Sequence, residues 1–250
     1  MIAAPEVSHL AVFVVLRGSA PSVAASIHER RPSRKWHNNI MSELTESNAP
    51  LAEPPDDLPD NIDTDCPRWV EELGIPYRAR EALRQLMAAG PLATPAVRQG
   101  LHHSNPAVRV GCCKVLDHYL DESALPELVE NLDHPDEEVR AWALHALACD
   151  KCKEGACRPG EDDVIPLAIQ MLLTDESRRV RQMAAGLLGP SVHRHPAVLG
   201  ALEQARQHDA HPVVRKIAGW FTPGGPRYQR LLPKPARRSR LRRAVAATNR

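Results

Sequence analysis

The chain has 250 residues, and its 32 Lys and Arg residues nearly balance its 31 Asp and Glu residues, which leaves a formal net charge of +1. This length allows one or two domains with a sizeable core, and the balance argues against a uniformly basic nucleic-acid-binding protein. Aromatic residues make up only 4% of the chain, which argues against β-sandwiches and barrels.

The first 66 residues are predicted to be disordered. Residues 1–40 hold one short apolar run, at 10–16, which lacks the basic residues that precede the apolar part of a secretory signal. Met41 opens a polar segment and could be the natural start, so 1–40 could be a start-site extension. Residues 42–66 combine many acidic side chains with repeated prolines, and such a segment buries too little apolar surface to fold. We expect an acidic linker there.

Two short apolar patterns follow the acidic segment. Residues 69–73 and 76–90 carry apolar side chains at helical spacing, and Gly90 is typical of a residue that ends a helix. We expect these residues to form a helical cap at the N-terminal end of the next region.

The middle of the chain repeats. The dipeptide Val-Arg recurs at Arg109, Arg140, Arg181 and Arg215, with spacings of 31, 41 and 34 residues. Each copy follows a polar turn. A small residue lies three positions after each arginine and, in the first three copies, a leucine lies seven positions after it, which places one apolar stripe on a helix.

A second amphipathic segment precedes each of the last three turns, at 124–132, 164–173 and 197–205. Pro126 and Pro166 are expected in the first turn of their helices, where a missing N–H costs little. Each unit is then a helix pair that cannot bury its apolar face alone. We predict an all-α solenoid of about four stacked pairs over residues 67–222.

The repeat resembles the HEAT repeat family, and more narrowly the bacterial HEAT repeats related to phycobilin-lyase subunits. The motif is best kept by residues 134–147, and the resemblance covers about residues 93–221. It implies that a turn aspartate and the arginine of the second helix help to fix the repeat geometry. It also implies an extended surface that binds other proteins.

The long spacing between Arg140 and Arg181 marks an insertion that contains Cys149, Cys152 and Cys157. Three thiols in the pattern C-x2-C-x4-C on a short charged loop are expected to be exposed, and they can bind one metal ion. His118 is the candidate fourth ligand, because it stands nine residues after its arginine, as Cys149 does.

Other readings of this loop stay open. Cys113 or His145 could be the fourth ligand, or a second subunit could supply ligands. The metal could be zinc or part of an iron–sulfur cluster, the thiols could form a disulfide or be redox-active, or they could be reduced thiols without a role. Cys112 and Cys113 are expected to be packing residues of the core, since the other copies have Ala at the position of Cys112 and Leu, Ala or Gly at the position of Cys113.

Residues 223–250 carry many arginines and no acidic residue, so we expect a basic disordered tail. Residues 227–250 could bind nucleic acid without sequence preference, or could be a solubilising tail, or could pair with the acidic linker. Aromatic residues are not interleaved with the last arginines, so base stacking is not expected there.

The sequence as a whole predicts a cytoplasmic, bacterial, non-catalytic scaffold for protein–protein interaction. Its six cysteines are too sparse for a disulfide-stapled secreted protein, and no apolar run is long enough to span a membrane. None of the phosphate-binding, nucleotide-binding or nucleophile motifs that mark common enzymes is present. The alternatives are a metal-binding or thiol-dependent role of the cysteine loop, with zinc as the expected metal, and nucleic-acid association through the tail.

Overall fold

The computed structural model describes residues 62–154 and 157–233, and these residues form helices, turns and loops without a β-strand. Helix α2 (Ile62–Glu72) and helix α3 (Ala79–Ala89) pack together at the N-terminal end. Helix α3 ends at Gly90, whose φ of 58° is a conformation that few other residues adopt, so the predicted glycine stop is confirmed. The two helices are the expected cap.

Four helix pairs follow the cap in this part of the chain, as the repeat predicts. Short 3-10 turns flank several of the first helices and let them begin or end tightly. The pairs are α4 (Thr94–Gly100) with α5 (Pro106–His118), α6 (Leu125–Glu130) with α7 (Glu137–Ala148), α8 (Glu161–Thr174) with α9 (Arg178–Leu188), and α10 (Pro196–His208) with α11 (Pro212–Trp220). A short helix, α12 (Pro226–Leu231), closes the described region.

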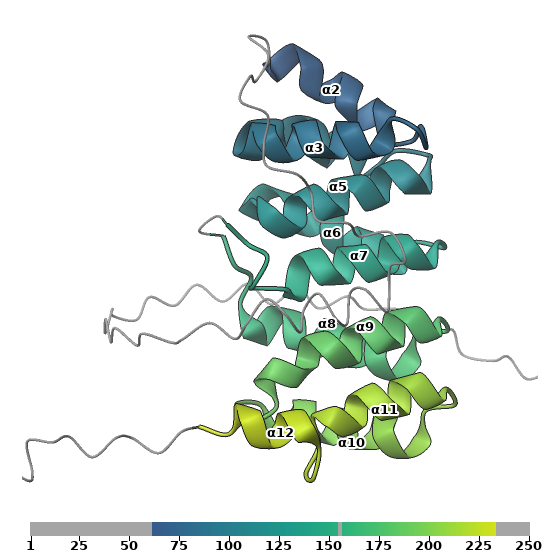
Figure 1. Ribbon diagram of the computed structural model, residues 1–250, viewed down its shortest axis with the longest axis vertical. Helices are drawn as coiled ribbons and strands as arrows, with labels where there is room; N and C mark the ends of the chain where they lie inside the picture. The colour runs from purple at the N-terminus through teal and green to yellow at the C-terminus, as the bar shows by residue number, and fades with distance from the viewer. Residues whose placement is uncertain (1–61, 155–156, 234–250) are drawn as a thin grey trace, which may run out of the picture.

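The pairs stack into a solenoid (Figure 1). The second helices α5, α7, α9 and α11 lie one below the other, and each contacts the next. The first helices lie behind them, and α8 and α10 contact each other in the same way. The predicted all-α solenoid with an N-terminal helical cap is therefore confirmed.

The apolar stripe that defines the repeat lies inside this stack. The valines, the small residues and the leucines at the matching positions of the four second helices are all 2% exposed or less, because neighbouring helices close over them. In the fourth copy Thr222 stands at the position of the leucine. It is fully buried too, and its hydroxyl donates to the carbonyl of Gly219. The buried set is Val108, Val139, Val180 and Val214; Cys112, Ala143, Ala184 and Ala218; and Leu116, Leu147 and Leu188.

Polar turns start the second helices by capping their free N–H groups. The side chains of Asn105, Asp136 and Ser177 each accept a hydrogen bond from the backbone N–H two residues later, at 3.0, 2.8 and 3.1 Å. His211 does the same through Nδ1, at 3.3 Å. These caps explain why each polar turn of the sequence is followed at once by a helix.

The arginine that marks each repeat joins neighbouring repeats. Arg140 donates to both carboxylate oxygens of Asp175, at 2.9 and 3.0 Å, and to the carbonyls of its own turn at His134 and Pro135. Arg181 holds Asp209 in the same two-pronged way, at 2.7 and 3.1 Å. Such bidentate pairs fix distance and orientation together, so these two repeats have the arginine–aspartate geometry that the resemblance implies.

The pattern varies at the two ends of the stack. Arg109 donates to the side-chain amide oxygen of Asn131 at 3.0 Å rather than to a carboxylate. Arg215 donates only to the carbonyls of Asp209 and Ala210 within the described region, because no further repeat follows it there. We call the contacts of these four arginines the arginine ladder.

Three expectations from the sequence differ from the structure. Helix α2 begins at Ile62, before the expected start of the solenoid at residue 67, and Cys66 of the expected linker 42–66 is 2% exposed in the core. Helix α12 lies inside the expected tail 223–250. Pro166 lies within α8 and not in its first turn, because α8 starts earlier, at three acidic residues that favour a helix N-terminus.

The rest of the predicted disordered segments, 1–61 and 234–250, lies outside the described residues. Among the helices of the described region, none has the length and the apolar character that crossing a membrane requires.

Candidate functional site

The insertion between α7 and α8 is anchored to the end of α5. The backbone N–H of Glu154 donates to the carbonyl of His118 at 2.9 Å. One carboxylate oxygen of Glu154 lies 3.3 Å from Nδ1 of His118, and the other accepts from the hydroxyl of Tyr119 at 3.2 Å. The loop therefore has a defined place against the neighbouring repeat.

A buried lysine ties the same loop to the end of α7. Nζ of Lys153 donates to the carbonyls of Ala146 and Cys149, at 2.7 and 3.0 Å, and the residue is 4% exposed. These carbonyls have no partner inside the helix, so the lysine satisfies them and places its positive charge at the negative end of the helix dipole. Arg158 in turn donates to the carbonyl of Lys153 at 3.1 Å.

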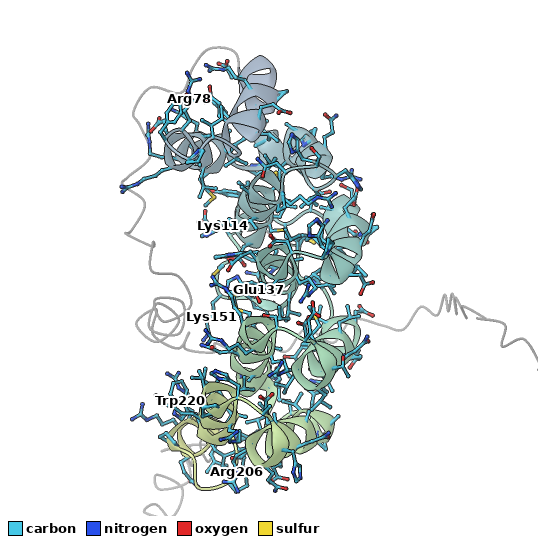
Figure 2. The ribbon with its side chains drawn as sticks, turned by 90° about the vertical axis from the view of Figure 1, so that its right-hand side faces the viewer. Arg78, Lys114, Glu137, Lys151, Arg206 and Trp220 are labelled. Carbon is cyan, nitrogen blue, oxygen red and sulfur yellow. The ribbon has the colours of Figure 1, made fainter. Side chains whose placement is uncertain are left out.

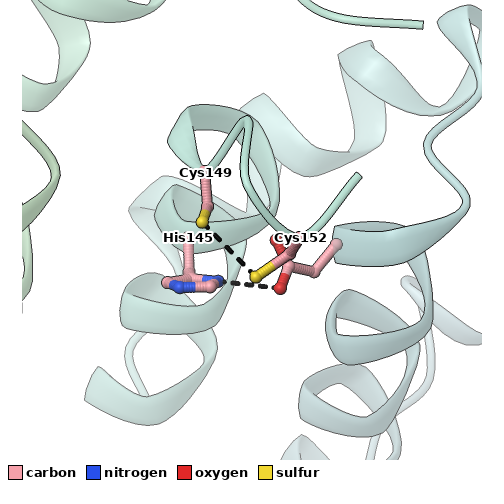
Figure 3. A group of neighbouring side chains, drawn as sticks. His145, Cys149 and Cys152 are labelled. Carbon is pink, nitrogen blue, oxygen red and sulfur yellow. Dashed lines mark hydrogen bonds and ion pairs between the residues drawn. The ribbon is translucent and has the colours of Figure 1, made fainter. Parts of the chain in front are cut away.

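This arrangement brings four polar side chains together between two repeats. Asp117 comes from the last turn of α5, His145 from the last turn of α7, Cys149 from the C-cap of α7 and Cys152 from the insertion. Their donor atoms all lie within 4.8 Å of one another, and Figure 3 shows His145, Cys149 and Cys152 side by side. We call these four side chains the buried cluster.

The cluster is closed off from solvent. Asp117, His145 and Cys149 are 3%, 1% and 4% exposed, and Cys152 is partly buried. Oδ2 of Asp117 lies 3.1 Å from Nδ1 of His145. Figure 3 shows Cys149 and Cys152 turned toward each other, with Sγ atoms 3.4 Å apart, and neither is in a disulfide.

The cluster shifts the titration of its own members. Burial opposes a positive charge on His145, but Asp117 and Cys149 outweigh it and raise the pKa of the imidazole to about 10. The hydrogen bond with Cys149, burial and the Asp117 carboxylate all raise the pKa of the Cys152 thiol. Without a metal ion, these neighbours favour the charged form of His145 and the neutral form of the Cys152 thiol.

Two of the predicted metal ligands lie in the cluster and two do not. Cys149 and Cys152 are there, together with His145, which the sequence offered as an alternative fourth ligand. Cys157 and His118 are outside it. The two clustered cysteines are also less exposed than the sequence suggested, because the loop folds back on α5 and α7.

Helix geometry explains why His118 lies outside the cluster. Successive residues of a helix point about 100° apart, so His118 and Asp117 face different directions. His118 lies against Glu154 at the edge of the loop, and Asp117 points inward at His145. Counting positions from the arginine selected the turn of α5 that reaches the cluster, but Asp117 and not His118 is the residue of that turn that lies in it.

Cys113 is not a ligand of this group either. It is fully buried in the core, as the sequence predicts, and burial raises the pKa of its thiol to about 12. Cys112 is equally buried, and burial raises the pKa of its thiol as well. Both residues are packing residues.

Asp117 is the functional candidate that the sequence reasoning missed. A signal exists: eight residues after the arginine, the next two copies have the small residues Ala148 and Gly189, and the first copy has a carboxylate. A charged residue at a position where other copies carry small side chains is unusual and marks a local purpose.

The cluster can do three things chemically. Its thiolates, imidazole and carboxylate are all ligands that zinc accepts. Its two thiols could form a disulfide if oxidised. In the absence of both events, it is a buried ion pair between Asp117 and His145 with two thiols beside it.

The start of the basic tail belongs to the fold. The guanidinium of Arg227 in α12 lies 5.1 Å from the ring centre of Trp220 and 5.8 Å from that of Phe221. Burial lowers the pKa of Arg227. This arginine therefore packs on α11 and is poorly placed to contact a phosphate backbone.

Comparison with known proteins supports the repeat. Residues 74–148, from the loop between α2 and α3 through α7, match the family model of HEAT repeats. Searches of curated proteins and of solved structures gave no significant match. The match is to HEAT repeats in general, so the narrower relation to phycobilin-lyase repeats stays a prediction.

Proposed function

We propose that this HEAT-repeat chain is a non-catalytic scaffold that binds a protein partner along the solenoid. The observation that carries the proposal is the continuous stack from α2 to α12, which presents an extended surface. HEAT repeats commonly serve this purpose. The cytoplasmic and bacterial setting predicted from the sequence remains part of the same proposal.

The side of the stack formed by the second helices is the preferred binding surface. Nζ of Lys114 lies 4.8 Å from the ring centre of Trp142, and Nζ of Lys216 lies 5.6 Å from that of Trp220. Figure 2 shows Lys114, Lys151 and Trp220 along one side of the stack. Lysines beside aromatic rings offer both charge and apolar area, which suits an acidic protein segment.

Charge reversal on this side tests the proposal. The full chain is used as bait in an extract of its source cells, and captured proteins are identified by crosslinking and mass spectrometry. The double variant Lys114→Glu with Lys216→Glu should retain less than about a tenth of the partner, because each change replaces attraction by repulsion. Arg206→Glu, at the lower end of the stack in Figure 2, is the matched control and should retain it.

Equal capture by the double variant and the wild type would contradict binding on this side. Crosslinks that map to the first helices α6, α8 and α10 would place the partner on the opposite side. Absence of any protein that crosslinks reproducibly to the solenoid would contradict the scaffold itself.

Nucleic-acid association remains a prediction for the residues beyond 233. Because Arg227 and Arg230 belong to α12, deletion of 227–250 would damage the fold as well as remove charge. Deletion of 234–250 is the cleaner test, and duplex binding at low salt should be lost if this segment carries it. Unchanged binding would show that the segment plays no part.

A further inference from the structure

We propose that the buried cluster is a closed structural zinc site that joins the second helices α5 and α7 to the insertion. The inference goes beyond the scaffold function and does not depend on it, since a metal site could stabilise the repeats whatever they bind.

The spacing of the donor atoms fits a tetrahedral zinc ion. With usual zinc–ligand bond lengths, two sulfur ligands are about 3.8 Å apart, and a nitrogen and an oxygen ligand about 3.3 Å apart. The two Sγ atoms are 3.4 Å apart, and the Asp117–His145 contact is 3.1 Å. The donor atoms of all four side chains lie within 4.8 Å of one another, so small movements bring them around one ion.

One oxygen of the Asp117 carboxylate lacks a hydrogen-bond donor. Oδ1 of Asp117 is fully buried and accepts no hydrogen bond from any residue of the described region. A buried carboxylate oxygen without a donor is costly, and such atoms call for an explanation such as an ion. A zinc ion between the Asp117 carboxylate and the His145 ring would give this oxygen a positive partner and would replace the present contact of Oδ2 with Nδ1.

The surroundings suit a structural site rather than a catalytic one. A catalytic zinc keeps one position open for water or substrate, and here protein side chains supply all four donors in a buried place. The ring of Trp142 lies 5.3 Å from that of His145, edge-on, and shields this side of the cluster. Two thiolates with an imidazole also favour zinc over magnesium or calcium, which prefer oxygen ligands alone.

Charge balance points in the same direction. Two thiolates and a carboxylate carry three negative charges, so zinc with a neutral histidine leaves one negative charge in the site. Nζ of Lys153 donates to the carbonyl of Cys149 at 3.0 Å. This positive side chain offsets the remaining charge.

Metal content of the purified full chain tests the site. We expect about one zinc ion per chain, and a loss of most of it in Cys149→Ser and Cys152→Ser. Cys157→Ser is the matched control, because it removes the third thiol of the same loop from outside the cluster, and it should keep its zinc. Asp117→Asn should weaken zinc binding by about tenfold or more, whether the carboxylate binds zinc or orients His145.

A second measurement uses the wild-type chain, so it tests the site even if a substitution prevents folding. Co²⁺ is exchanged for zinc in the wild-type chain and its absorption is recorded. We expect the visible bands of tetrahedral cobalt and the near-ultraviolet charge transfer of cobalt–thiolate bonds. With metal bound, Cys149 and Cys152 should resist alkylation, and a chelator should expose them.

Three results would overturn the proposal. The first is less than about half an equivalent of zinc after reconstitution with zinc ion, together with an octahedral cobalt spectrum. The second is a zinc content of Cys157→Ser that falls as far as that of Cys149→Ser. The third is a disulfide between Cys149 and Cys152 in protein purified without oxidant, read from its mass.

Discussion

Arg140 and Asp175 hold two repeats together through a pair of charges that water barely reaches. Their side chains are 8% and 7% exposed. Arg140→Ala leaves the carboxylate buried without its partner, and we expect a loss of about 3 kcal/mol in the free energy of unfolding. Urea unfolding followed by circular dichroism measures it. Arg68→Ala, which breaks an exposed helical pair with Asp65, is the control and should change stability by less than about 0.5 kcal/mol.

Glu161, at the start of α8, makes part of the stability dependent on pH. Hydrogen bonds from Arg194 and His195 lower the pKa of its carboxyl from the usual 4.5 to about 2, against a smaller opposing effect of burial. A lowered pKa means that the contact stabilises the fold fully above about pH 4.5. The contribution is lost as pH falls toward 2.

The variant Glu161→Gln isolates this effect. We expect it to be less stable than the wild type at pH 6, with the difference shrinking steadily between pH 4.5 and 2. Thermal unfolding at several pH values measures it. Glu130→Gln, at an exposed position, is the control. A difference that stays constant down to pH 2 would contradict the assignment.

The contact between Asp117 and His145 could not be predicted from the sequence. Cys149 and Cys152 could be found because their spacing is local. The partnership of Asp117 with His145 depends on the offset between α5 and α7, and sequence spacing determines that offset only to within a turn of helix. His118 and Asp117 are adjacent in the sequence, yet only Asp117 points into the cluster.

At the scale of one element, α8 contains a proline where a helix usually lacks one. Pro166 is exposed and lies beyond the first turn of α8, so it removes the N–H that would bond to the carbonyl of Asp162. Pro166→Ala should raise the melting temperature, with a gain of about 1 kcal/mol or more. Thermal unfolding measures the change.

Pro126→Ala is the matched control for this prediction. Pro126 is exposed as well, but it stands in the first turn of α6, where no helical hydrogen bond is lost. We expect no gain, or a slight loss, because proline restricts the unfolded chain. Equal stabilisation by both changes would contradict the explanation from helix position.

The helix pairs themselves could be predicted because their signals are local. A valine, a small residue and, in the first three copies, a leucine at fixed spacing define one face of a helix, and all four copies bury these residues. The first and last helices of the described region were harder to predict. The start of α2 lies among acidic residues, and α12 lies among arginines, so composition suggested disorder where Cys66 and Arg227 pack on the stack.

At the scale of the whole molecule, stability should fall from the middle of the stack to its ends. Helix α7 has neighbours on several sides, and all its residues from 139 to 147 are buried, whereas α12 has no buried residue. In a solenoid each repeat is stabilised mainly by its neighbours. We therefore expect the amides of α7 to exchange with solvent at least about a hundredfold more slowly than those of α12.

Hydrogen exchange followed by mass spectrometry measures this gradient peptide by peptide. Uniform protection from α3 to α12 would show instead that the stack opens as a single cooperative unit. If exchange in α5 and α7 becomes faster on addition of a chelator while α11 is unaffected, the gradient and the zinc site are linked.

The arginine ladder also has a direction along the chain, which matters while the protein is being made. Arg140 pairs with Asp175 and Arg181 with Asp209, and in both pairs the ribosome adds the aspartate after the arginine. Until that aspartate is made, the arginine of the preceding repeat lacks its carboxylate. The third and fourth repeats therefore each complete the contacts of the repeat before them, and this part of the solenoid can assemble in the order of its synthesis.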